Sequence, residues 1–338
     1  MKKWITLLLA IILSLPLCAC SVDKSDSDGN NTDGYYPVTV TDHAGRTVEI
    51  TKQPERLLSS YYITTSLFIA LDIDDKLVGV ETQADKRPIY GMAAPHILQL
   101  PSIGTAKELD LELCASLSPD LAVLPMKLKG MEDALEDLKI PVLFVDPENR
   151  ERQANMISLV GDAVNCKDEA KRLNDFMTKQ AQMLEDLMKD TTAPTVYLAG
   201  NSDFLSTAGN AMYQADMIAF AGGINVAGGL TDTYWAQIDY EQFLVWDPEY
   251  IILASDASYT VEDVYNDPNL ASCTAVTNGN VYRLPNDAEP WDSPVPSGIL
   301  GSLWLANILH PDKLSDVDYR SLIDEFYETF YGFTYSEK

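Results

Sequence analysis

The order of apolar and polar residues predicts a chain of short strands that alternate with helices. Residues 36–50 alternate around Asp42-His43-Ala44-Gly45-Arg46, which predicts a hairpin with a glycine-containing turn. Short apolar runs predict buried strands at residues 56–60, 76–81, 119–125, 141–145, 195–199, 250–254 and 280–284. Helices are expected between strands, among them residues 65–71, 131–138 and 297–309. Such alternation favours parallel pairing within α/β lobes.

One longer amphipathic segment interrupts this alternation. Apolar residues recur at intervals of three and four from Ala170 to Met188, with Asp168 as a possible N-cap and Pro194 beyond the end. A helix over residues 168–190 would be about 34 Å long, roughly the width of a small domain. We therefore predict an α/β fold with two lobes that have central, mainly parallel sheets and are joined by one long backbone helix. The segments are residues 36–165 for the N-terminal lobe, 166–192 for the linking helix and 193–338 for the C-terminal lobe.

The start of the chain has the features of an export signal. Two lysines precede an apolar run that ends at Leu17, and the run is too short to span a bilayer, since a membrane helix needs roughly 20 apolar residues. The Ser-, Asp-, Asn- and Gly-rich residues that follow predict a flexible tether over residues 20–35. Leu17-Cys18-Ala19-Cys20 resembles the lipobox of bacterial lipoproteins, which implies that residues 1–19 are removed and that Cys20 carries a lipid anchor. The alternative is an ordinary secretion signal with Cys20 there by chance.

Charge and composition argue against several classes of protein. A formal net charge of −27 disfavours nucleic acid as a partner, because phosphates require Lys and Arg. Only three histidines and three cysteines beyond Cys20 are present, without CxxC spacing, so we expect no metal site and no thiol-redox site. The chain lacks GxSxG and HExxH, although its many carboxylates leave a glycosidase pair open. We expect neither enzymatic activity nor a cofactor; a secreted hydrolase is the weaker alternative.

Several motifs together resemble a known family. Residues 40–46 with Pro54-Glu55-Arg56 are similar to the opening of solute-binding proteins of ABC importers for iron complexes, haem and cobalamin. The further matching stretches are residues 102–104, 112, 117–121, 221–227, 241, 246–252 and 275–282. They follow the order of the family over nearly the whole mature chain. The chain departs from the family at Ser66, where Glu is frequent, and at Asp72, where Gly is frequent; we expect both on the first helix.

The resemblance implies a ligand cleft between two lobes whose relative motion a rigid helix limits. It implies a membrane-tethered protein that captures an iron complex (a ferric siderophore or haem) or a cobalamin-like chelate. The partners would be the transmembrane permease subunits of an ABC importer and their ATPase, and the location the outer face of the cell membrane or the periplasm. An oxyanion receptor of the molybdate or tungstate type stays open, and an adhesin or scaffold would lack the two-lobed design.

The carboxyl ends of the predicted strands indicate where a ligand would bind. Aromatic rings there suit a bulky chelate, and the cations would neutralise an anionic ligand. The predicted ligand-binding residues are Tyr61, Tyr62, Arg87, Met126, Lys127, Trp235, Trp291 and Asp292. Trp291 lies in the proline-rich segment 289–294, which we expect to present it as a fixed wall of the cleft. The alternative is a purely structural lid.

Two further positions are implied by the resemblance. Family members dock on the permease through one exposed glutamate on each lobe, and the matching residues here are Glu112 and Glu241. Each stands at the start of a predicted helix, before a Pro-Asp or Pro-Glu strand. Capping of the helix N-terminus is the alternative role for both carboxylates.

Overall fold

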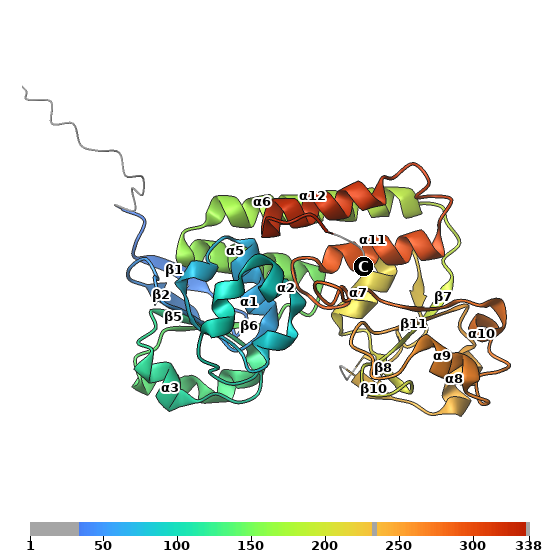
Figure 1. Ribbon diagram of the computed structural model, residues 1–338, viewed down its shortest axis with the longest axis horizontal. Coiled ribbons are helices and arrows are strands. Elements are labelled where there is room, and N and C mark those ends of the chain that lie inside the picture. The colour runs from blue at the N-terminus through green and yellow to red at the C-terminus, as the bar shows by residue number, and fades with distance from the viewer. Residues whose placement is uncertain (1–33, 232–234, 336–338) are drawn as a thin grey trace, which may run out of the picture. The chain divides into compact units, whose positions relative to one another are not determined.

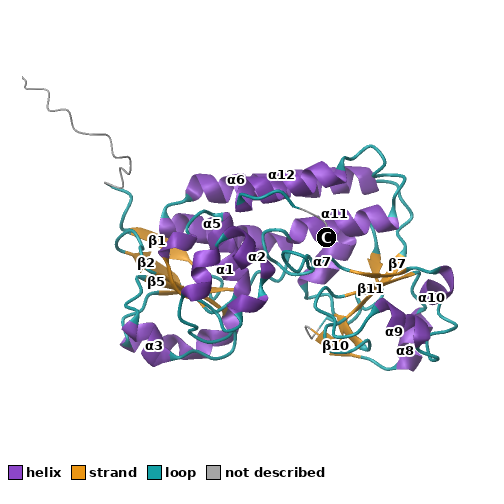
Figure 2. Cartoon of the chain, in the orientation of Figure 1, coloured by secondary structure: helices purple, strands orange, loops and turns teal. Residues whose placement is uncertain are grey.

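The computed structural model describes residues 34–231 and 235–335, which belong to one compact unit (Figure 1). The predicted export signal, most of the tether and Cys20 lie outside the described residues. In the described part of the chain, no helix is both long and apolar enough to cross a membrane. Two separate groups of strands, each with its own helices, lie below a layer of longer helices (Figure 2). This arrangement confirms the predicted α/β fold with two lobes.

The predicted hairpin opens the N-terminal lobe. Strands β1 (Val38–Thr41) and β2 (Thr47–Ile50) pair in antiparallel register, Val38 with Ile50 and Thr41 with Thr47. The Asp42 carboxylate, 4 % exposed, accepts hydrogen bonds from the backbone N–H groups of Ala44, Arg46 and Phe144. The Arg46 guanidinium, 2.6 Å away, neutralises it. These contacts close the turn and attach the hairpin to the sheet behind it.

The N-terminal lobe is built on a four-stranded sheet in which all strands are parallel, in the order β4-β3-β5-β6. The strands are β3 (Leu57–Ser59), β4 (Leu77–Gly79), β5 (Leu121–Pro125) and β6 (Val142–Val145). The helices are α1 (Tyr62–Ala70), α2 (Pro88–Ala93), α3 (Leu111–Ser116) and α4 (Glu132–Asp137). Every residue of β5 and β6 is buried, as expected for parallel strands covered on both faces.

The C-terminal lobe has a mixed sheet in the order β10-β8-β7-β11-β12, with β9 also paired to β7. The strands are β7 (Thr195–Ala199), β8 (Ser206–Ala208), β9 (Ile224–Asn225), β10 (Trp235–Gln237), β11 (Tyr250–Leu253) and β12 (Val281–Arg283). The helices are α7 (Tyr213–Phe220), α8 (Tyr240–Trp246), α9 (Val261–Asn266) and α10 (Thr274–Asn278). Strands β7, β11 and β12 are parallel, as predicted, whereas the antiparallel strands β8 and β10 were not anticipated.

Four longer helices make up the connection between the lobes. They are α5 (Arg150–Val164), α6 (Lys167–Met188), α11 (Gly298–Leu309) and α12 (Tyr319–Tyr331). Helix α6 is the predicted long helix, but its N-cap is Cys166, so the predicted capping role of Asp168 is wrong. The reason is that α5 ends at Asn165 in a left-handed conformation, which reverses the chain within two residues. Asp168 instead supplies negative charge to the first turn of α6.

The C-terminal helix α12 runs beside α6 (Figure 1). The ring of Phe176 on α6 lies 5.5 Å from the ring of Phe326 and 5.7 Å from the ring of Phe330 on α12. The Tyr331 hydroxyl, at the end of α12, donates a hydrogen bond to the carbonyl of Ser66 on α1 in the N-terminal lobe. One apolar core thus runs from the N-terminal lobe through these helices into the C-terminal lobe. The single linking helix that we predicted is one member of a helical layer, which we call the spine (α5, α6, α11 and α12).

Asp72 does not lie on the first helix, in contrast to our expectation. Helix α1 ends at Ala70, and Asp72 follows the C-cap Leu71 with φ of 57°. A left-handed residue after a helix is most often glycine, and Asp is among the residues that tolerate it. Backbone geometry therefore accounts for the preference of the family for glycine here. Ser66 does lie on α1, and it is buried.

We predict that Phe176→Ala lowers the free energy of unfolding by about 3 kcal/mol, because it removes a buried ring and leaves a cavity between α6 and α12. Urea unfolding followed by circular dichroism measures the change. The control is Lys179→Ala, an exposed position on the same helix, which should change stability by less than about 0.5 kcal/mol. A loss below about 1 kcal/mol for Phe176→Ala would show that the two helices do not share a continuous core.

Candidate functional site

Loops at the carboxyl ends of the two sheets approach each other between the lobes. The Tyr62 hydroxyl donates a hydrogen bond of 3.0 Å to Ser293 Oγ, and the Ile89 N–H donates one of 3.1 Å to the Ala288 carbonyl. An ion pair of 3.7 Å joins Arg87 Nη1 to Asp256 Oδ2. Tyr62, Arg87 and Ile89 belong to the N-terminal lobe and their partners to the C-terminal lobe. We call Tyr62, Arg87, Asp256, Asn286 and Ser293 the interlobe cluster, and it is our candidate site.

Tyr62 is the aromatic centre of this cluster. It is the first residue of α1, so its ring projects from the helix start that follows the carboxyl end of β3. The Arg87 guanidinium lies over the ring, 4.1 Å from its centroid, a cation–π contact. Burial raises the pKa of Tyr62 to about 12, and the hydroxyl therefore stays protonated at neutral pH. The ring of Tyr61 stands edge-on to that of Tyr62, with centroids 5.5 Å apart.

A buried carboxylate fixes the start of α1 from behind. Glu81, 6 % exposed, accepts a hydrogen bond of 2.6 Å from Thr65 Oγ1 and one of 2.5 Å from the Tyr90 hydroxyl. Burial raises the pKa of Glu81, and the two donated hydrogen bonds work in the opposite direction. Since Thr65 Oγ1 also lies 2.8 Å from Ser59 Oγ at the end of β3, the strand, the helix and the carboxylate form one network. This network holds Tyr62 in place before any ligand arrives.

Arg87 and Asp256 remain accessible to solvent. The side chain of Arg87 is 28 % exposed and that of Asp256 is 41 % exposed. Arg87 precedes α2, whose first residue Pro88 fixes the local backbone. Asp256 follows β11 and accepts a hydrogen bond from Asn286 Nδ2 at 2.5 Å. The site therefore presents one cation and one anion, on opposite lobes, each with a supporting residue.

The prediction that Trp291 forms an exposed wall of the cleft is wrong. Its side chain is 2 % exposed, Nε1 donates to the Tyr327 hydroxyl at 2.9 Å, and the ring lies against that of Tyr335. Asp292 is 3 % exposed and accepts hydrogen bonds from the N–H and the hydroxyl of Ser255. Both side chains therefore hold segment 289–294 in the core of the lobe, which agrees with the alternative that this segment has a purely structural role.

The same segment packs closely against α11. A Cβ on Gly298 would lie 2.4 Å from the Ser293 carbonyl oxygen, and one on Gly301 would lie 2.2 Å from that of Trp291. Glycine at both positions is what allows the loop to approach the helix so closely. The loop thus presents Ser293, which sequence reasoning missed because serine carries no distinguishing pattern, to Tyr62.

The remaining predicted residues lie on neighbouring loops. Met126 and Lys127 begin the 3-10 helix after β5, with Met126 half-buried and Lys127 exposed. Trp235 begins β10, 38 % exposed, and its ring leaves no room for a side chain at Gly200. Among the described residues, no hydrogen bond, ion pair or ring contact joins these three to the interlobe cluster. Their part in ligand binding stays a prediction.

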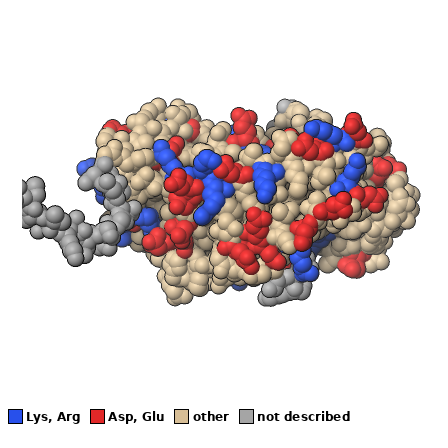
Figure 3. Space-filling model, turned by 90° about the horizontal axis from the view of Figure 1, so that it is seen from above, with Lys and Arg blue, Asp and Glu red and all other residues tan. Residues whose placement is uncertain are grey.

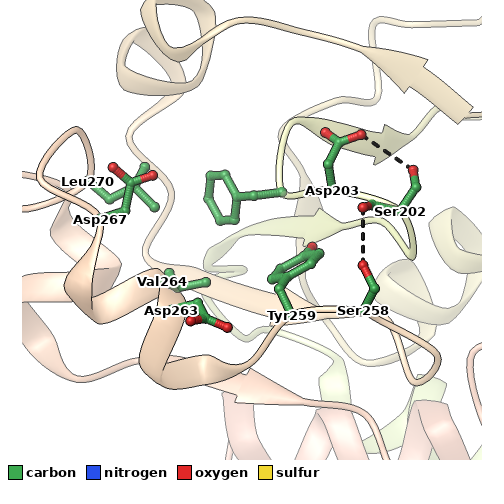
Figure 4. Close-up of a pocket in the computed structure, with 9 residues that line it drawn as sticks. Ser202, Asp203, Ser258, Tyr259, Asp263, Val264, Asp267 and Leu270 are labelled. Atoms are coloured by element: carbon green, nitrogen blue, oxygen red, sulfur yellow. Dashed lines mark hydrogen bonds between the residues drawn. The ribbon is translucent and has the colours of Figure 1, made fainter.

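A separate pocket of about 290 Å³ opens within the C-terminal lobe (Figure 4). Phe204 and Tyr259 line it together with Asp203, Asp263 and Asp267. Each aspartate already has a local role: Asp263 completes the capping box of α9, Asp267 accepts from the Tyr240 hydroxyl, and Asp203 accepts from the Leu205 N–H. Loop and helix-end structure therefore accounts for the acidic residues of this pocket.

Metal-ligating and charged groups are dispersed over the described residues. Within residues 34–231 and 235–335, no group of three or more His, Cys, Asp or Glu side chains is arranged to hold a metal ion. Cys114, Cys166 and Cys273 are free thiols and buried. Figure 3 shows acidic side chains spread over the face seen from above, with basic ones among them. That face carries no continuous basic surface of the kind that nucleic acid requires.

Glu112 and Glu241 occupy matching places in the two lobes. Each is exposed and is the second residue of its helix, α3 or α8. The N-caps are Asp110 and Asp239, whose carboxylates already accept from the helix N–H groups. Helices α3 and α8 lead, through Pro-Asp and Pro-Glu, into the central strands β5 and β11. Since other residues cap both helices, neither glutamate is needed for capping.

Comparison with known proteins gives a consistent result. The sequence matches the periplasmic binding protein family over residues 59–288. It is 25 % identical to the molybdate-binding protein MolA of Haemophilus influenzae, over 88 % of this chain and 91 % of that protein. It is 25 % identical to the uncharacterised ABC transporter substrate-binding lipoprotein YvrC of Bacillus subtilis, over 94 % and 100 %. It is 24 % identical to the Fe(3+) dicitrate-binding periplasmic protein FecB of Escherichia coli, over 76 % and 84 %.

A solved structure of the same fold is that of MolA bound to molybdate. It superposes with a TM-score of 0.80 at 24 % identity and covers 88 % of this chain and 99 % of MolA. A likeness at this identity establishes the fold, which agrees with the two-lobed architecture described above.

We predict that Glu289→Gln raises the melting temperature at pH 8 by about 2 °C or more and leaves it unchanged near pH 4. Glu289 is 1 % exposed, and neither carboxyl oxygen has a hydrogen-bond partner within the described residues. Burial raises its pKa, and the nearby hydroxyls of Ser297, Ser66 and Tyr331, none of which forms a hydrogen bond with the carboxylate, offset this only in part. The folded protein therefore retains a proton that the unfolded chain releases above pH ~4.3, so stability is lost as the pH rises.

Differential scanning calorimetry at both pH values measures this effect. The exposed Glu151 provides the control, since Glu151→Gln should shift the melting temperature little at either pH. A Gln variant at position 289 that is less stable than the original protein at pH 8 would show that Glu289 is ionised and paired in the fold.

Proposed function

The chain belongs to the periplasmic binding protein family of solute-binding proteins, and from this premise we propose that it captures a small anionic ligand for an ABC importer. A molybdate-type oxyanion is the first candidate. The observation that carries the proposal is Arg87, which is half-exposed between the lobes and held over the Tyr62 ring. A guanidinium in a fixed orientation is the side chain best suited to oxygen atoms of an anion.

The surroundings of Arg87 favour a small ligand over a macrocycle. With Trp291 in the core, the candidate site, as far as the described residues form it, lacks the large aromatic wall on which our expectation of haem or cobalamin depended. The Ser293 hydroxyl, which accepts from Tyr62 and keeps its own hydrogen, and the Arg87 guanidinium supply hydrogen-bond donors instead. Lys127, on the exposed loop after β5, adds a second cation to the same lobe. Similarity to MolA over 88 % of the chain supports the oxyanion class.

A ferric chelate with carboxylate groups is the second candidate. Similarity to FecB favours it, as do the exposed Trp235 and the half-buried Tyr61, which offer ring faces to a larger ligand. Arg87 would serve a carboxylate as well as an oxyanion. Because the protein belongs to a family of solute-binding proteins, we propose that either ligand is bound and released without chemical change.

We further propose that the mature protein is attached to the membrane through a lipid on Cys20. Two acyl chains would hold it firmly, since each buried methylene contributes about 0.8 kcal/mol. The similarity to YvrC, whose name describes it as a lipoprotein, supports the anchor. The protein would then meet the permease on the outer face of the cell membrane, or in the periplasm of a cell with an outer membrane.

Docking on the permease is assigned to Glu112 and Glu241. Both are exposed, and their matching places put one carboxylate on each lobe. Arginine side chains on the two transmembrane subunits would be suitable partners, because paired charges across an interface fix its orientation. The ATPase then drives transport from the opposite side of the membrane.

We expect molybdate or tungstate to raise the melting temperature of the wild-type protein. Binding to the folded state alone stabilises it by about 2.7 kcal/mol at a ligand concentration 100 times the Kd. Arg87→Gln should raise the Kd about 10- to 100-fold, because it removes hydrogen bonds to a charged group. Isothermal titration with molybdate measures the Kd, and Lys171→Gln, an exposed change on the spine, is the control that should leave it unaltered.

The melting temperature is also measured with ferric citrate, haem and cyanocobalamin. A response to haem or cyanocobalamin but to no anion would replace our proposal with a bulky chelate. Turnover of an ester or a glycoside, without any response to these ligands, would contradict the receptor function as a whole.

For docking, we predict that the double variant Glu112→Ala and Glu241→Ala binds molybdate with unchanged Kd but no longer supports its uptake by cells that contain the permease. Glu151→Ala is the matched control, since Glu151 is an exposed glutamate in the first turn of α5. Uptake of labelled molybdate gives the measurement. A weaker Kd in the double variant, or equal uptake by variant and control, would contradict the docking role.

A further inference from the structure

We propose that Asp256 is a built-in counter-ion that occupies Arg87 until an anionic ligand displaces it. Binding would then exchange an ion pair between the lobes for an ion pair between protein and ligand. The inference rests on the proposed function, since it requires an anion to bind at Arg87. It adds a residue that sets the affinity and the charge selectivity of the site.

The position of the pair is the first observation behind this inference. Arg87 comes from the N-terminal lobe, just before α2, and Asp256 from the C-terminal lobe, just after β11. Nη1 and Oδ2 are 3.7 Å apart, whereas a charge-assisted hydrogen bond is about 2.7–2.9 Å long. The attraction is therefore mainly coulombic, and the donors of the guanidinium are not saturated by Asp256.

One of the other Arg–Asp pairs among the described residues serves as a comparison. Arg46 and Asp42 are 2.6 Å apart, and their side chains are 17 % and 0 % exposed. That pair is closed and joins the hairpin to the sheet. The pair of Arg87 and Asp256, at 28 % and 41 % exposed, is open to solvent from which a ligand could arrive. Its geometry suits exchange better than structural support.

Both members of the open pair are held in place by neighbours that would remain after exchange. The Arg87 guanidinium makes a cation–π contact with the Tyr62 ring, and the Tyr62 hydroxyl donates a hydrogen bond to Ser293. Asp256 accepts from Asn286 and would keep this partner once Arg87 is taken. Displacement therefore leaves neither Asp256 nor the Tyr62 ring without support.

The exchange has a consequence for selectivity. An anion gains Arg87 but must break the pair and come near Asp256, so Asp256 lowers anion affinity by a modest factor. A neutral ligand cannot replace the carboxylate and leaves the pair intact. An exposed ion pair is weak, and the factor should accordingly not exceed about five-fold.

The test is a double-mutant cycle on molybdate binding at low ionic strength. Asp256→Asn keeps the shape of the side chain and removes its charge; we expect the Kd for molybdate to fall about two- to five-fold. In the Arg87→Gln background, where there is no pair to break, the same change should lower the Kd clearly less than it does in the wild type. Glu262→Gln is the control, because it removes one exposed negative charge from the same lobe, in the first turn of α9.

Other results would overturn the inference. An unchanged Kd in Asp256→Asn, or one lowered equally by Glu262→Gln, would show that Asp256 is no specific competitor. A raised Kd would make Asp256 a direct ligand contact. If wild-type protein bound no anion in the first titration, both the proposed function and the exchange would fail. Binding by the wild type with no response to Asp256→Asn would leave the proposed function standing and remove the inference alone.

Discussion

The contact between α6 and α12 is the constraint on which the rest of the molecule depends. Phe176 packs against both Phe326 and Phe330, and α12 then reaches α1 of the N-terminal lobe. A chain linked only by α6 could pivot at either end of that helix. With α12 packed along it, the two lobes share one apolar core, and pivoting would require that core to open. Binding at the interlobe cluster, the site we propose, would therefore proceed mainly through side-chain movements, with little movement of the lobes.

Buried carboxylates give this cluster its fixed geometry. Glu81 anchors the start of α1 through Thr65 and Tyr90, and Asp292 anchors the opposite loop through Ser255. Burial raises the pKa of both acids, which indicates that keeping them ionised away from water is costly. Hydrogen-bond donors offset that cost and fix the positions of the side chains they belong to. As a result, Tyr62 and Ser293 form a hydrogen bond between the lobes in a defined orientation.

The sequence predicted those parts of the fold that depend on local pattern. Strands β5 and β6 are continuous apolar runs because both of their faces are buried, and the stripe on α6 is wide and regular. Strands β8 and β10 are three residues each, without an apolar run, and only pairing with each other and with β7 defines them. Of the residues in the candidate site, Tyr62 and Arg87 could be predicted, because they lie beyond the carboxyl ends of predicted strands. The burial of Trp291 could not be predicted, because Tyr327 and Tyr335, which enclose it, lie 36 and more residues along the chain.

A rigid frame and an exchangeable ion pair are complementary features. If the lobes do not close far, the site cannot grip a ligand by burying it more deeply, and affinity has to come from groups already in place. Arg87, oriented by the Tyr62 ring, is such a group, but an unpaired guanidinium between two acidic lobes would attract any anion and any free carboxylate. Asp256 pairs with Arg87 at 3.7 Å but leaves N–H donors of the guanidinium free. An anion therefore gains by displacing the carboxylate only if it accepts hydrogen bonds from more of the Arg87 donors than Asp256 does. In the exchange that we propose, selectivity arises from competition between the ligand and Asp256 for Arg87.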